Sequence, residues 1–537
     1  MSERVLLGDE AVALGAVHGG LSAAYSYPGT PATEILEFLL VHAKKNGRPH
    51  VAWTANEKTA FEQALGACFA GRRALTSMKH VGLNVAADPF MNAALVSLQG
   101  GLVVASADDP GMHSSQNEQD SRFYADFARV ICLEPSDPQQ AYDMTRDGYE
   151  LSEKYSVPVM MRLVTRLAHS RMAVKLAPPR PENPARKNPV PASWILLPAN
   201  ARRYQRRVID LQKELTAWSE SCAWNRMELN PERRELGVIT AGIGESYYLE
   251  NLDDLGWKPS HVHVGAYPLP VDLIRKLAAH VKKVLVLEDG YPLIERQLRG
   301  LLPQAVQVAG RMSGEVPPDG ELTPDLVRAA LGLPARPMLS LKGTPLPGRP
   351  PQLCTGCPHG HMFKALNKAL QRTDASLVTS DIGCYTLGAL APYDAVETCV
   401  CMGASVGMAI GAAEAGLHPV VATIGDSTFL HSGTTNLMDA VARNVHMTLL
   451  ILDNQTTAMT GGQPTVAPSP KLKDVVLGLG VDPAHLHVLD ALPRQVDANA
   501  EVLRREIEYR GLSVVIGVRE CLETAKRRKR LSAAVAE

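Results

Sequence analysis

The chain has 537 residues with a formal net charge of −1; 45% of the residues are hydrophobic and 21% are charged. Length and composition predict a globular protein of about three domains. The balanced charge gives no global basic field that would attract nucleic acid. No apolar run reaches the ~20 residues of a membrane-spanning helix. The apolar core of a secretion signal is also missing from the first residues, MSERVLLGDEAVALG. We therefore expect a cytoplasmic protein with no nucleic acid and no membrane partner.

One local exception to this balance is a basic run near the end of the sequence, from Lys526 to Arg530. Such a run is usually a solvated end of the chain. The alternative is a docking site for an acidic partner or for nucleic acid. We assign residues 526–537 to a basic tail.

The first predicted domain covers residues 1–178. Apolar, strand-like runs alternate there with stretches whose apolar spacing suits helices, such as 33–44 and 56–71; the strand-like runs are 23–29, 73–80, 101–108, 128–135 and 158–164. This alternation predicts a parallel sheet with helices on both faces. In such a sheet the loops that follow the strands carry function.

Two further α/β domains are predicted after a Pro- and Arg-rich linker and surface helix at 179–234. The second domain covers 235–333, with strands at 235–242, 260–267 and 282–289. A Pro-rich linker at 334–352 leads into the third domain, 353–525. The expected fold class is therefore α/β, with three parallel-sheet domains.

The most informative stretch is 422–462, which reads as strand, Gly-Asp-Ser turn, helix, strand and Asp-Asn turn. Asp426 ends one strand and Asn454 ends the next, so a single βαβ crossover brings both to one sheet edge. Their oxygens suit a hard cation, and Gly425 allows an anion to approach the backbone. A helix beginning near Ser432 would offer free N–H groups to a phosphate. The alternative is an ordinary crossover with polar turns.

Nine cysteines are present, and five of them fall between 354 and 401. Cys354-x-x-Cys357 and the later Cys384 suit a zinc ion, an iron–sulfur cluster or a redox dithiol, and spacing alone leaves the three open.

Polar clusters also end the predicted strands of the first domain. They are Tyr27–Pro31, the pair Asn56-Glu57, Met78–Asn84 and Asp108–Asp120. Taken singly, each is explained as a capped turn, and Glu57 as a first-turn acid that the helix dipole favours.

Taken together, the motifs at 27–31, 56–57, 78–89, 107–120, 353–360, 381–388 and 425–462 resemble thiamine-diphosphate-dependent 2-oxoacid:acceptor oxidoreductases, most of all the large subunit of the indolepyruvate:ferredoxin branch. The family signature is Gly-Asp-Gly followed by Asn, and here Ser427 takes the third position. The resemblance implies a pyrimidine-binding domain, a transketolase-C-like domain and a diphosphate-binding domain, in that order.

The resemblance also assigns site residues. Glu57 would activate the cofactor, and Thr30, His80 and His113 would be catalytic, with Lys79 beside them. Asp426, Asn454 and the Thr456 carbonyl would bind Mg²⁺. The cofactor would further contact Gly383, Gly403, Ala404, Ser405, Gly425 and Ser427. A [4Fe–4S] cluster would be held by Cys354, Cys357, Cys384 and Cys521, with Cys399 or Cys401 as alternative fourth ligands.

The implied reaction is oxidative decarboxylation of an aryl 2-oxoacid, such as indolepyruvate, to an aryl-acetyl-CoA. Electrons would pass through the cluster to ferredoxin or another acceptor, and the alternative is a non-oxidative thiamine-diphosphate-dependent decarboxylase. Implied partners are a smaller catalytic subunit, a second large subunit and coenzyme A as co-substrate. Many large subunits continue into a ferredoxin-like domain; no such cysteine run follows residue 526 here, so we expect another subunit or carrier to take the electrons.

Overall fold

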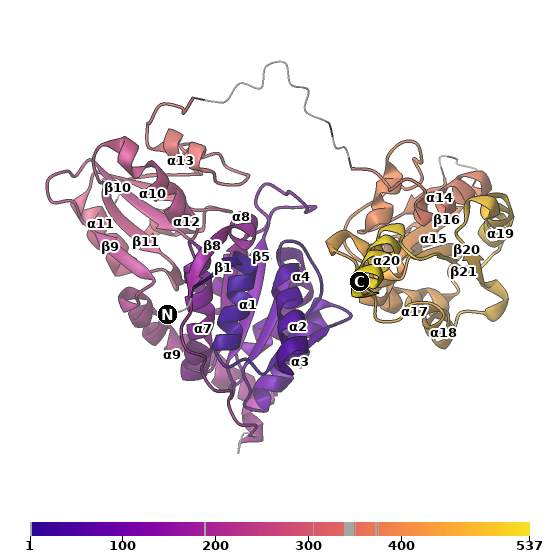
Figure 1. The fold of residues 1–537 in the computed structure, drawn as a ribbon, viewed down its shortest axis with the longest axis horizontal. Helices are drawn as coiled ribbons and strands as arrows, with labels where there is room; N and C mark the ends of the chain where they lie inside the picture. Colours follow the sequence, from indigo (N-terminus) through magenta and orange to yellow (C-terminus); the bar gives the residue numbers. More distant parts are fainter. Residues whose placement is uncertain are drawn as a thin grey trace. The chain divides into compact units, whose positions relative to one another are not determined.

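A computed structural model describes residues 3–186, 190–303, 305–337, 348, 351–370, 373 and 375–536. The chain forms two compact units, 1–340 and 341–537, and in each of them helices surround central sheets (Figure 1). The predicted division into three domains stays a prediction, and most of the predicted 334–352 linker lies outside the described residues. None of the described helices is both long and apolar enough to cross a membrane.

The first unit is built on a seven-stranded sheet in the order β12-β6-β7-β5-β4-β2-β3. All its pairs are parallel except β12–β6. The strands are β2 (Ala23–Ser26), β3 (His50–Trp53), β4 (Ala74–Lys79), β5 (Leu102–Asp108), β6 (Ile131–Leu133), β7 (Val159–Val164) and β12 (Ala266–Tyr267).

Most helices of this sheet follow a strand, as the alternating sequence predicts. They are α1 (Gly8–His18), α2 (Thr33–Asn46), α3 (Glu57–Phe69), α4 (His80–Val85), α5 (Ala87–Ala93), α6 (Arg122–Ala128), α7 (Pro138–Tyr155) and α8 (Thr165–His169). A ribbon that the sequence did not indicate pairs β1 (Glu3–Leu7) with β8 (Arg171–Lys175) in antiparallel register.

A second sheet in the same unit has the order β14-β13-β10-β11-β9. Its strands are β9 (Asn225–Glu228), β10 (Leu236–Ala241), β11 (Ser260–Val264), β13 (Lys283–Leu287) and β14 (Gln307–Ala309); its helices are α9 (Pro198–Ser221), α10 (Gly244–Leu255), α11 (Val271–His280), α12 (Leu293–Leu301) and α13 (Pro324–Ala330). The strand predicted at 260–267 splits, because its last residues leave this sheet as β12 and pair with β6.

The second unit contains one parallel sheet in the order β15-β16-β17-β21-β20. Its strands are β15 (Leu377–Thr379), β16 (Val420–Gly425), β17 (Met447–Asp453), β20 (Leu486–Asp490) and β21 (Leu512–Val518), with a short ribbon of β18 (Thr456–Thr457) and β19 (Gln463–Pro464). The helices are α14 (Pro358–Ala369), α15 (Ala404–Glu414), α16 (Asp426–Thr428), α17 (Thr434–Arg443), α18 (Lys471–Gly478), α19 (Val496–Glu508) and α20 (Leu522–Ala536).

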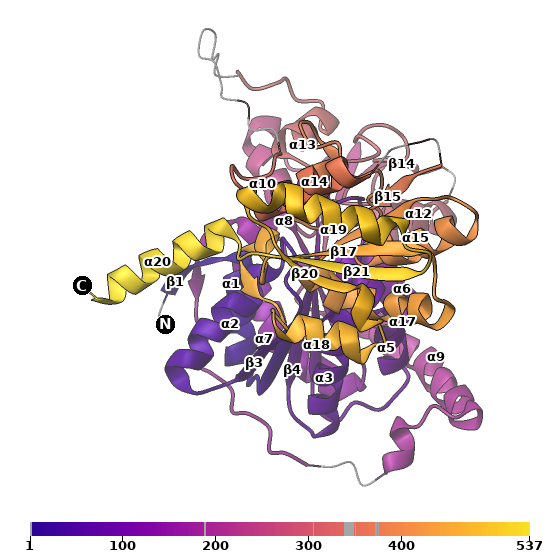
Figure 2. The ribbon, with the colours of Figure 1, turned by 90° about the vertical axis from the view of Figure 1, so that its right-hand side faces the viewer.

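Alternate strand residues of this sheet bury two separate cores. Leu449 and Ile451 pack with α15, α17 and α18 on one face, whereas Leu450 and Leu452 pack with α14 and α19 on the other. Figure 2 shows α14 and α19 on one side of the sheet and α17 and α18 on the other. The carboxyl ends of β16 and β17 therefore meet between two helical layers, where the predicted cation ligands lie.

Candidate active site

Asp426 and Asn454 meet at the carboxyl edge of the second unit's sheet, as their spacing predicts. Asp426 opens α16 directly after β16, and Asn454 follows β17, its parallel neighbour. The backbone N–H of Asn454 donates to the Asp426 carboxylate. The Asn454 side-chain oxygen accepts from the backbone N–H of Thr456 at 3.1 Å. The three residues predicted to bind Mg²⁺ thus form one buried cluster.

The Asp426 carboxylate is electrostatically uncompensated within the described residues. Its side chain is buried, and its Oδ2 atom has no hydrogen-bond partner. Burial, together with the nearby charge of Asp453, raises the pKa of Asp426 well above its usual value. Such a group is stable only when a proton or a cation neutralises it. A carboxylate oxygen, an amide and backbone oxygens are the donors that Mg²⁺ prefers, so the residues fit this ion.

The residues predicted to contact the diphosphate surround this carboxylate. Gly403 caps α15 with a φ of 85°, and a Cβ there would lie 2.6 Å from Cβ of Ser432. A Cβ on Gly383 or Gly425 would meet the Tyr385 ring at 2.2 or 2.6 Å. Close packing therefore requires glycine at all three positions.

Asp381 and Tyr385 are site residues that we did not single out from the sequence. Asp381 follows β15 and accepts hydrogen bonds from Ser405, at 3.2 Å from the backbone N–H and 2.7 Å from the hydroxyl. Tyr385 donates its hydroxyl to the same carboxylate. Burial raises the pKa of Asp381 to about 6. An acid at a strand's carboxyl end was the available signal.

The structure brings the four predicted cluster cysteines to one cavity of about 310 Å³. Cys354 and Cys357 come from the turn before α14, Cys384 opens a 3-10 turn, and Cys521 precedes α20. Asn454 also lines this cavity, and its carbonyl accepts from the Cys521 backbone N–H at 3.0 Å. Cys399 and Cys401 are exposed and do not line it.

The cavity is suited to a cationic group larger than one ion. Burial first, and then the three neighbouring thiols, raise the pKa of Cys384 to about 12. The Cys384 thiol therefore stays protonated unless a metal centre draws off its proton. One water-sized sphere occupies about 10–15 Å³, far less than this cavity. Among the described residues, no three His, Cys, Asp or Glu side chains converge as ligands of a single ion.

Glu57 lies in the first unit, at the start of α3. Asn56 caps this helix by accepting from the Thr59 backbone N–H at 2.9 Å. Glu57 is only 5% exposed. A Cβ on Gly82 of α4 would lie 2.5 Å from the Glu57 Oε1 atom, so α4 packs directly on the carboxylate. Gly82 therefore fixes where the Glu57 carboxylate can lie.

Lys79 and His80 lie at the end of β4, beside the loops that the sequence singled out. The Lys79 ammonium donates to the Ser114 carbonyl at 2.8 Å, and burial lowers its pKa to about 8. His80 is buried, which lowers its pKa, and its Nε2 atom lies 3.3 Å from the Asn117 carbonyl. Gly29 packs against Lys79, with a built Cβ at 3.0 Å from the lysine Cβ, so the Tyr27–Pro31 loop that carries Thr30 joins this group.

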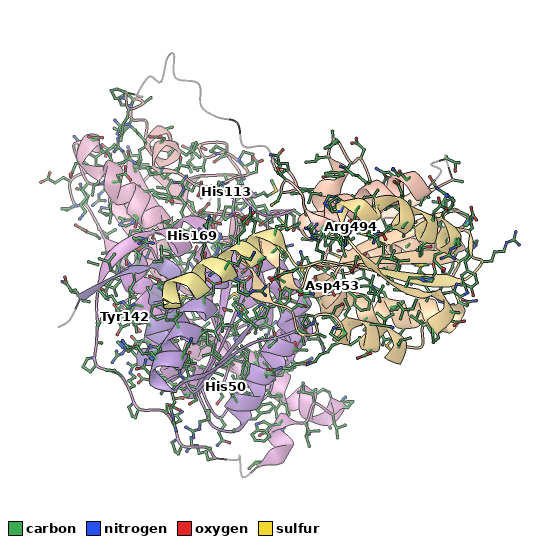
Figure 3. All side chains as sticks on the ribbon, turned by 45° about the vertical axis from the view of Figure 1, so that its right-hand side comes forward. His50, His113, Tyr142, His169, Asp453 and Arg494 are labelled. Carbon is green, nitrogen blue, oxygen red and sulfur yellow. The ribbon has the colours of Figure 1, made fainter. Side chains whose placement is uncertain are left out.

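His113 precedes Ser114, whose carbonyl accepts from Lys79, but the His113 side chain lines a separate cavity. Its side chain is 52% exposed, and its Nε2 atom lies 3.3 Å from Glu321. It lines a cavity of about 640 Å³ with Arg166, His169 and Tyr247, and Figure 3 shows His113 and His169 close together. Neither Glu57 nor His80 lines this cavity. The catalytic role of His113 stays a prediction.

Comparisons with known proteins agree with this arrangement. The family model "Pyruvate flavodoxin/ferredoxin oxidoreductase, thiamine diP-bdg" matches residues 14–204, and "Thiamine pyrophosphate enzyme, C-terminal TPP binding domain" matches 381–505. The chain is 37% identical to indolepyruvate oxidoreductase subunit IorA of Methanothermobacter thermautotrophicus, over 96% of this chain and 86% of that protein. It is 36% identical to IorA of Thermococcus kodakarensis, over 97% and 86%.

This chain belongs to the IorA family. The family resemblance and the α/β fold class predicted from the sequence are thereby confirmed. So is the enzyme class, a thiamine-diphosphate-dependent 2-oxoacid oxidoreductase. The two matched ranges contain Glu57 and Asp426, respectively. The IorA relatives are named as subunits, which implies a multi-subunit assembly. A solved 2-oxoglutarate:ferredoxin oxidoreductase from Magnetococcus marinus aligns with 57% of this IorA-family chain and 62% of that chain, at 22% identity and a TM-score of 0.49.

Proposed function

We propose that this chain oxidatively decarboxylates an aryl 2-oxoacid, such as indolepyruvate, and transfers the aryl-acetyl group to coenzyme A. One observation carries the proposal: the cavity lined by Cys354, Cys357, Cys384 and Cys521 is also lined by Asn454, of the predicted Mg²⁺ site. A redox group there would adjoin the diphosphate site. The aryl substrate is supported by the relatives, which are named indolepyruvate oxidoreductases.

The cofactor would be held at the edge of β16 and β17. Asp426, Asn454 and the Thr456 carbonyl would hold Mg²⁺, which neutralises the buried Asp426 carboxylate. The backbone of Gly425 to Ser427 and of Gly403 to Ser405 would accommodate the diphosphate, with Gly383 making room for the Tyr385 ring. When bound, thiamine diphosphate supplies the electron sink for decarboxylation.

Proton transfer and substrate binding fall to the first unit. Glu57, held in place by Gly82, would exchange a proton with the aminopyrimidine ring of the cofactor. Lys79 would bind the substrate carboxylate through a charge-assisted hydrogen bond. His80 and Thr30 would lie beside the reacting carbonyl, because both belong to the loops that surround Lys79.

The reaction releases two electrons, and the four cysteines of the second unit would hold the group that carries them away. One 2-oxoacid and one coenzyme A thiol give carbon dioxide, an acyl thioester, two electrons and one proton. When bound, a [4Fe–4S] cluster on the four cysteines supplies a one-electron carrier, so the electrons leave singly to ferredoxin or another acceptor. We further propose a smaller catalytic subunit and pairing of two large subunits as the assembly.

A non-oxidative decarboxylase is the second candidate, since it uses the same cofactor. It needs no cluster, so the four-cysteine cavity argues against it.

The test is anaerobic purification with any co-purifying subunit, followed by iron, sulfide and thiamine diphosphate analysis. Substrates are then compared by reduction of methyl viologen with coenzyme A: indolepyruvate, phenylpyruvate, pyruvate and 2-oxoglutarate. We expect about four irons per chain, bound thiamine diphosphate and a preference for the aryl substrates. Aldehyde formation without coenzyme A or an electron acceptor would favour the non-oxidative candidate instead.

A further inference from the structure

Helix α20 begins at the residue after Cys521, and its first turns close the four-cysteine cavity. Leu522, Thr524 and Arg527 line that cavity. A Cβ on Gly356, in the Cys354–Cys357 turn, would contact Leu522 at 3.6 Å. Arg527 donates to the Gly461 carbonyl at 2.6 Å, which fixes the start of the helix against the second unit. The helix is thus the surface element that directly continues the cysteine site.

The exposed side of α20 is strongly cationic. Five Lys and Arg residues and only one carboxylate occur from 522 to 530, and the side chains of residues 526–530 are exposed. Lys526 pairs with Glu523 and Arg528 with Glu520, each at 2.8 Å. For Lys529 and Arg530, no ion pair occurs within the described residues. Arg527 donates to a backbone carbonyl and makes no ion pair there either, so the surplus positive charge gathers at Arg527, Lys529 and Arg530.

The helix itself does not account for this charge. Cations stabilise a helix when they lie in its last turn, near the negative end of the macrodipole. The last turn of α20 contains none. The basic residues lie instead in its middle, about 8–14 Å along the axis from Cys521 at 1.5 Å per residue. Figure 2 shows α20 projecting away from the sheet of its own unit. The basic segment follows directly on Leu522 and Thr524, which line the cysteine cavity.

We propose that the basic segment Lys526–Arg530 of α20 is the docking surface for an acidic, one-electron iron–sulfur protein that takes electrons from the four-cysteine site. The inference rests on the proposed function, because it needs a one-electron group on those cysteines. Opposite charges steer such a carrier to the segment and hold it close to Cys521. The oxidised carrier accepts one electron at each encounter, so two encounters complete one 2-oxoacid oxidation.

The test compares two charge reversals of equal size in the assembled, cluster-loaded enzyme. K529E/R530E alters the docking segment; R202E/K213E alters two exposed cations on α9 and serves as the control. Binding of a plant-type [2Fe–2S] ferredoxin is measured by biolayer interferometry in 50 and 200 mM salt. We expect K529E/R530E to weaken binding by roughly 10-fold in low salt and to flatten its salt dependence, and the control to change it by less than about 2-fold.

A second readout separates this inference from the proposed function. The ratio of ferredoxin reduction to methyl viologen reduction should fall in K529E/R530E and not in the control, at equal iron content. If the wild type reduces no viologen with any 2-oxoacid, the proposed function fails, whatever the binding result. Unchanged ferredoxin binding by K529E/R530E overturns the docking surface. A second result also overturns it: the wild type binds a DNA duplex more tightly than ferredoxin, and K529E/R530E loses this DNA binding whereas the control keeps it. In that case α20 would be a nucleic-acid site.

Discussion

At the residue scale, Asp426 combines two conflicting properties: it is buried, and its Oδ2 atom has no partner within the described residues. Its raised pKa means that the cofactor-free fold loses stability as pH rises above the usual aspartate value of 3.8, and keeps it below that value. Replacing the carboxylate should therefore stabilise the empty protein while it destroys the cation site. This opposite effect on folding and on binding separates a ligand from a purely structural acid.

We predict that Asp426→Asn raises the unfolding free energy of the cofactor-free protein at pH 7 by about 1–3 kcal/mol. We also expect Mg²⁺-dependent thiamine diphosphate binding to weaken by at least about 100-fold, since second-shell changes alone cost about 10–100-fold. Thermal shift with and without Mg²⁺ and cofactor measures both. Asp439→Asn, an exposed acid of α17, should change neither. Full cofactor stabilisation of Asp426→Asn would remove Asp426 from the ligand set.

Gly82 tests the position of Glu57. In Gly82→Ala the new methyl group would lie 2.5 Å from Oε1 of Glu57, and the flexible glutamate must move away. We expect kcat to fall by roughly 100-fold or more, with little change in stability or cofactor affinity. Gly66→Ala in α3, where a Cβ would have no neighbour within 4 Å, is the matched control. In a Glu57→Gln background Gly82→Ala should cost almost nothing further; an additive loss would show that Gly82 acts elsewhere.

Lys79 gives a pH signature, because burial lowers its pKa to about 8. If its charge binds the substrate carboxylate, KM for the 2-oxoacid should rise as pH passes through 8, while kcat changes less. In the unfolded chain Lys79 keeps its proton up to about pH 10.5, whereas in the fold it loses the proton near pH 8. The free energy of unfolding should therefore rise as pH increases from 8 to 10.5. Lys79→Gln should raise KM at pH 7 by about 10-fold or more and remove its pH dependence; Lys58→Gln, at an exposed lysine of α3, should retain the wild-type profile.

The residues that sequence predicted well are those fixed by local spacing. Asp426 and Asn454 are one βαβ crossover apart, so topology alone brings them together. Asp381 and Tyr385 were missed because their role depends on packing between segments far apart in sequence, such as Gly425 on the Tyr385 ring. His113 was assigned from its polar loop, but the direction in which a loop side chain points is not encoded in spacing. Its contact is with Glu321, more than 200 residues away.

At the scale of elements, the predicted helix near Ser432 begins earlier. α16 starts at Asp426, and a π-helical segment, Phe429–Gly433, joins it to α17. Sequence spacing located the strands on either side, but the predicted start near Ser432 falls inside the π-helical segment. The result is that Asp426 itself occupies the helix N-terminus, where the dipole favours an anion. β20 was missed because it is an edge strand in which only Leu486 is buried, so it has no long apolar run.

The start of α20 also allows the fourth cluster ligand to be tested. Cys521 lines the four-cysteine cavity, whereas Cys399 and Cys401 do not. We predict that Cys521→Ser loses iron and brown colour on anaerobic purification, and that Cys401→Ser retains about four irons. Cofactor binding should survive in Cys521→Ser, because Cys521 contacts Asn454 through its backbone N–H. Iron loss in Cys401→Ser with retention in Cys521→Ser would reverse the assignment.

At the scale of the whole molecule, the first unit joins two sheets through buried charges. Arg162 of β7 donates to Asp108 at 2.7 Å and also to Glu134. Arg122 pairs with Glu288, which follows β13 of the other sheet, at 3.0 Å. Both arginine side chains are fully buried. This network, together with β12, explains why two sheets with separate strand patterns form one compact unit, which the Pro-rich boundaries in the sequence could not indicate.

Separate hydrophobic cores in the two units predict two thermal transitions. A variant in the arginine network should identify which transition belongs to the first unit. Arg162→Met leaves the buried Asp108 carboxylate without a guanidinium and leaves Glu134 with Arg122 alone, at 3.6 Å, which should destabilise the first unit by about 3–5 kcal/mol. Differential scanning calorimetry should show one transition lowered by roughly 10 °C and the other unchanged. Arg206→Met, at an exposed ion pair of α9, should move neither. A single transition, or an equal shift of both, would mean that the two units unfold cooperatively as one.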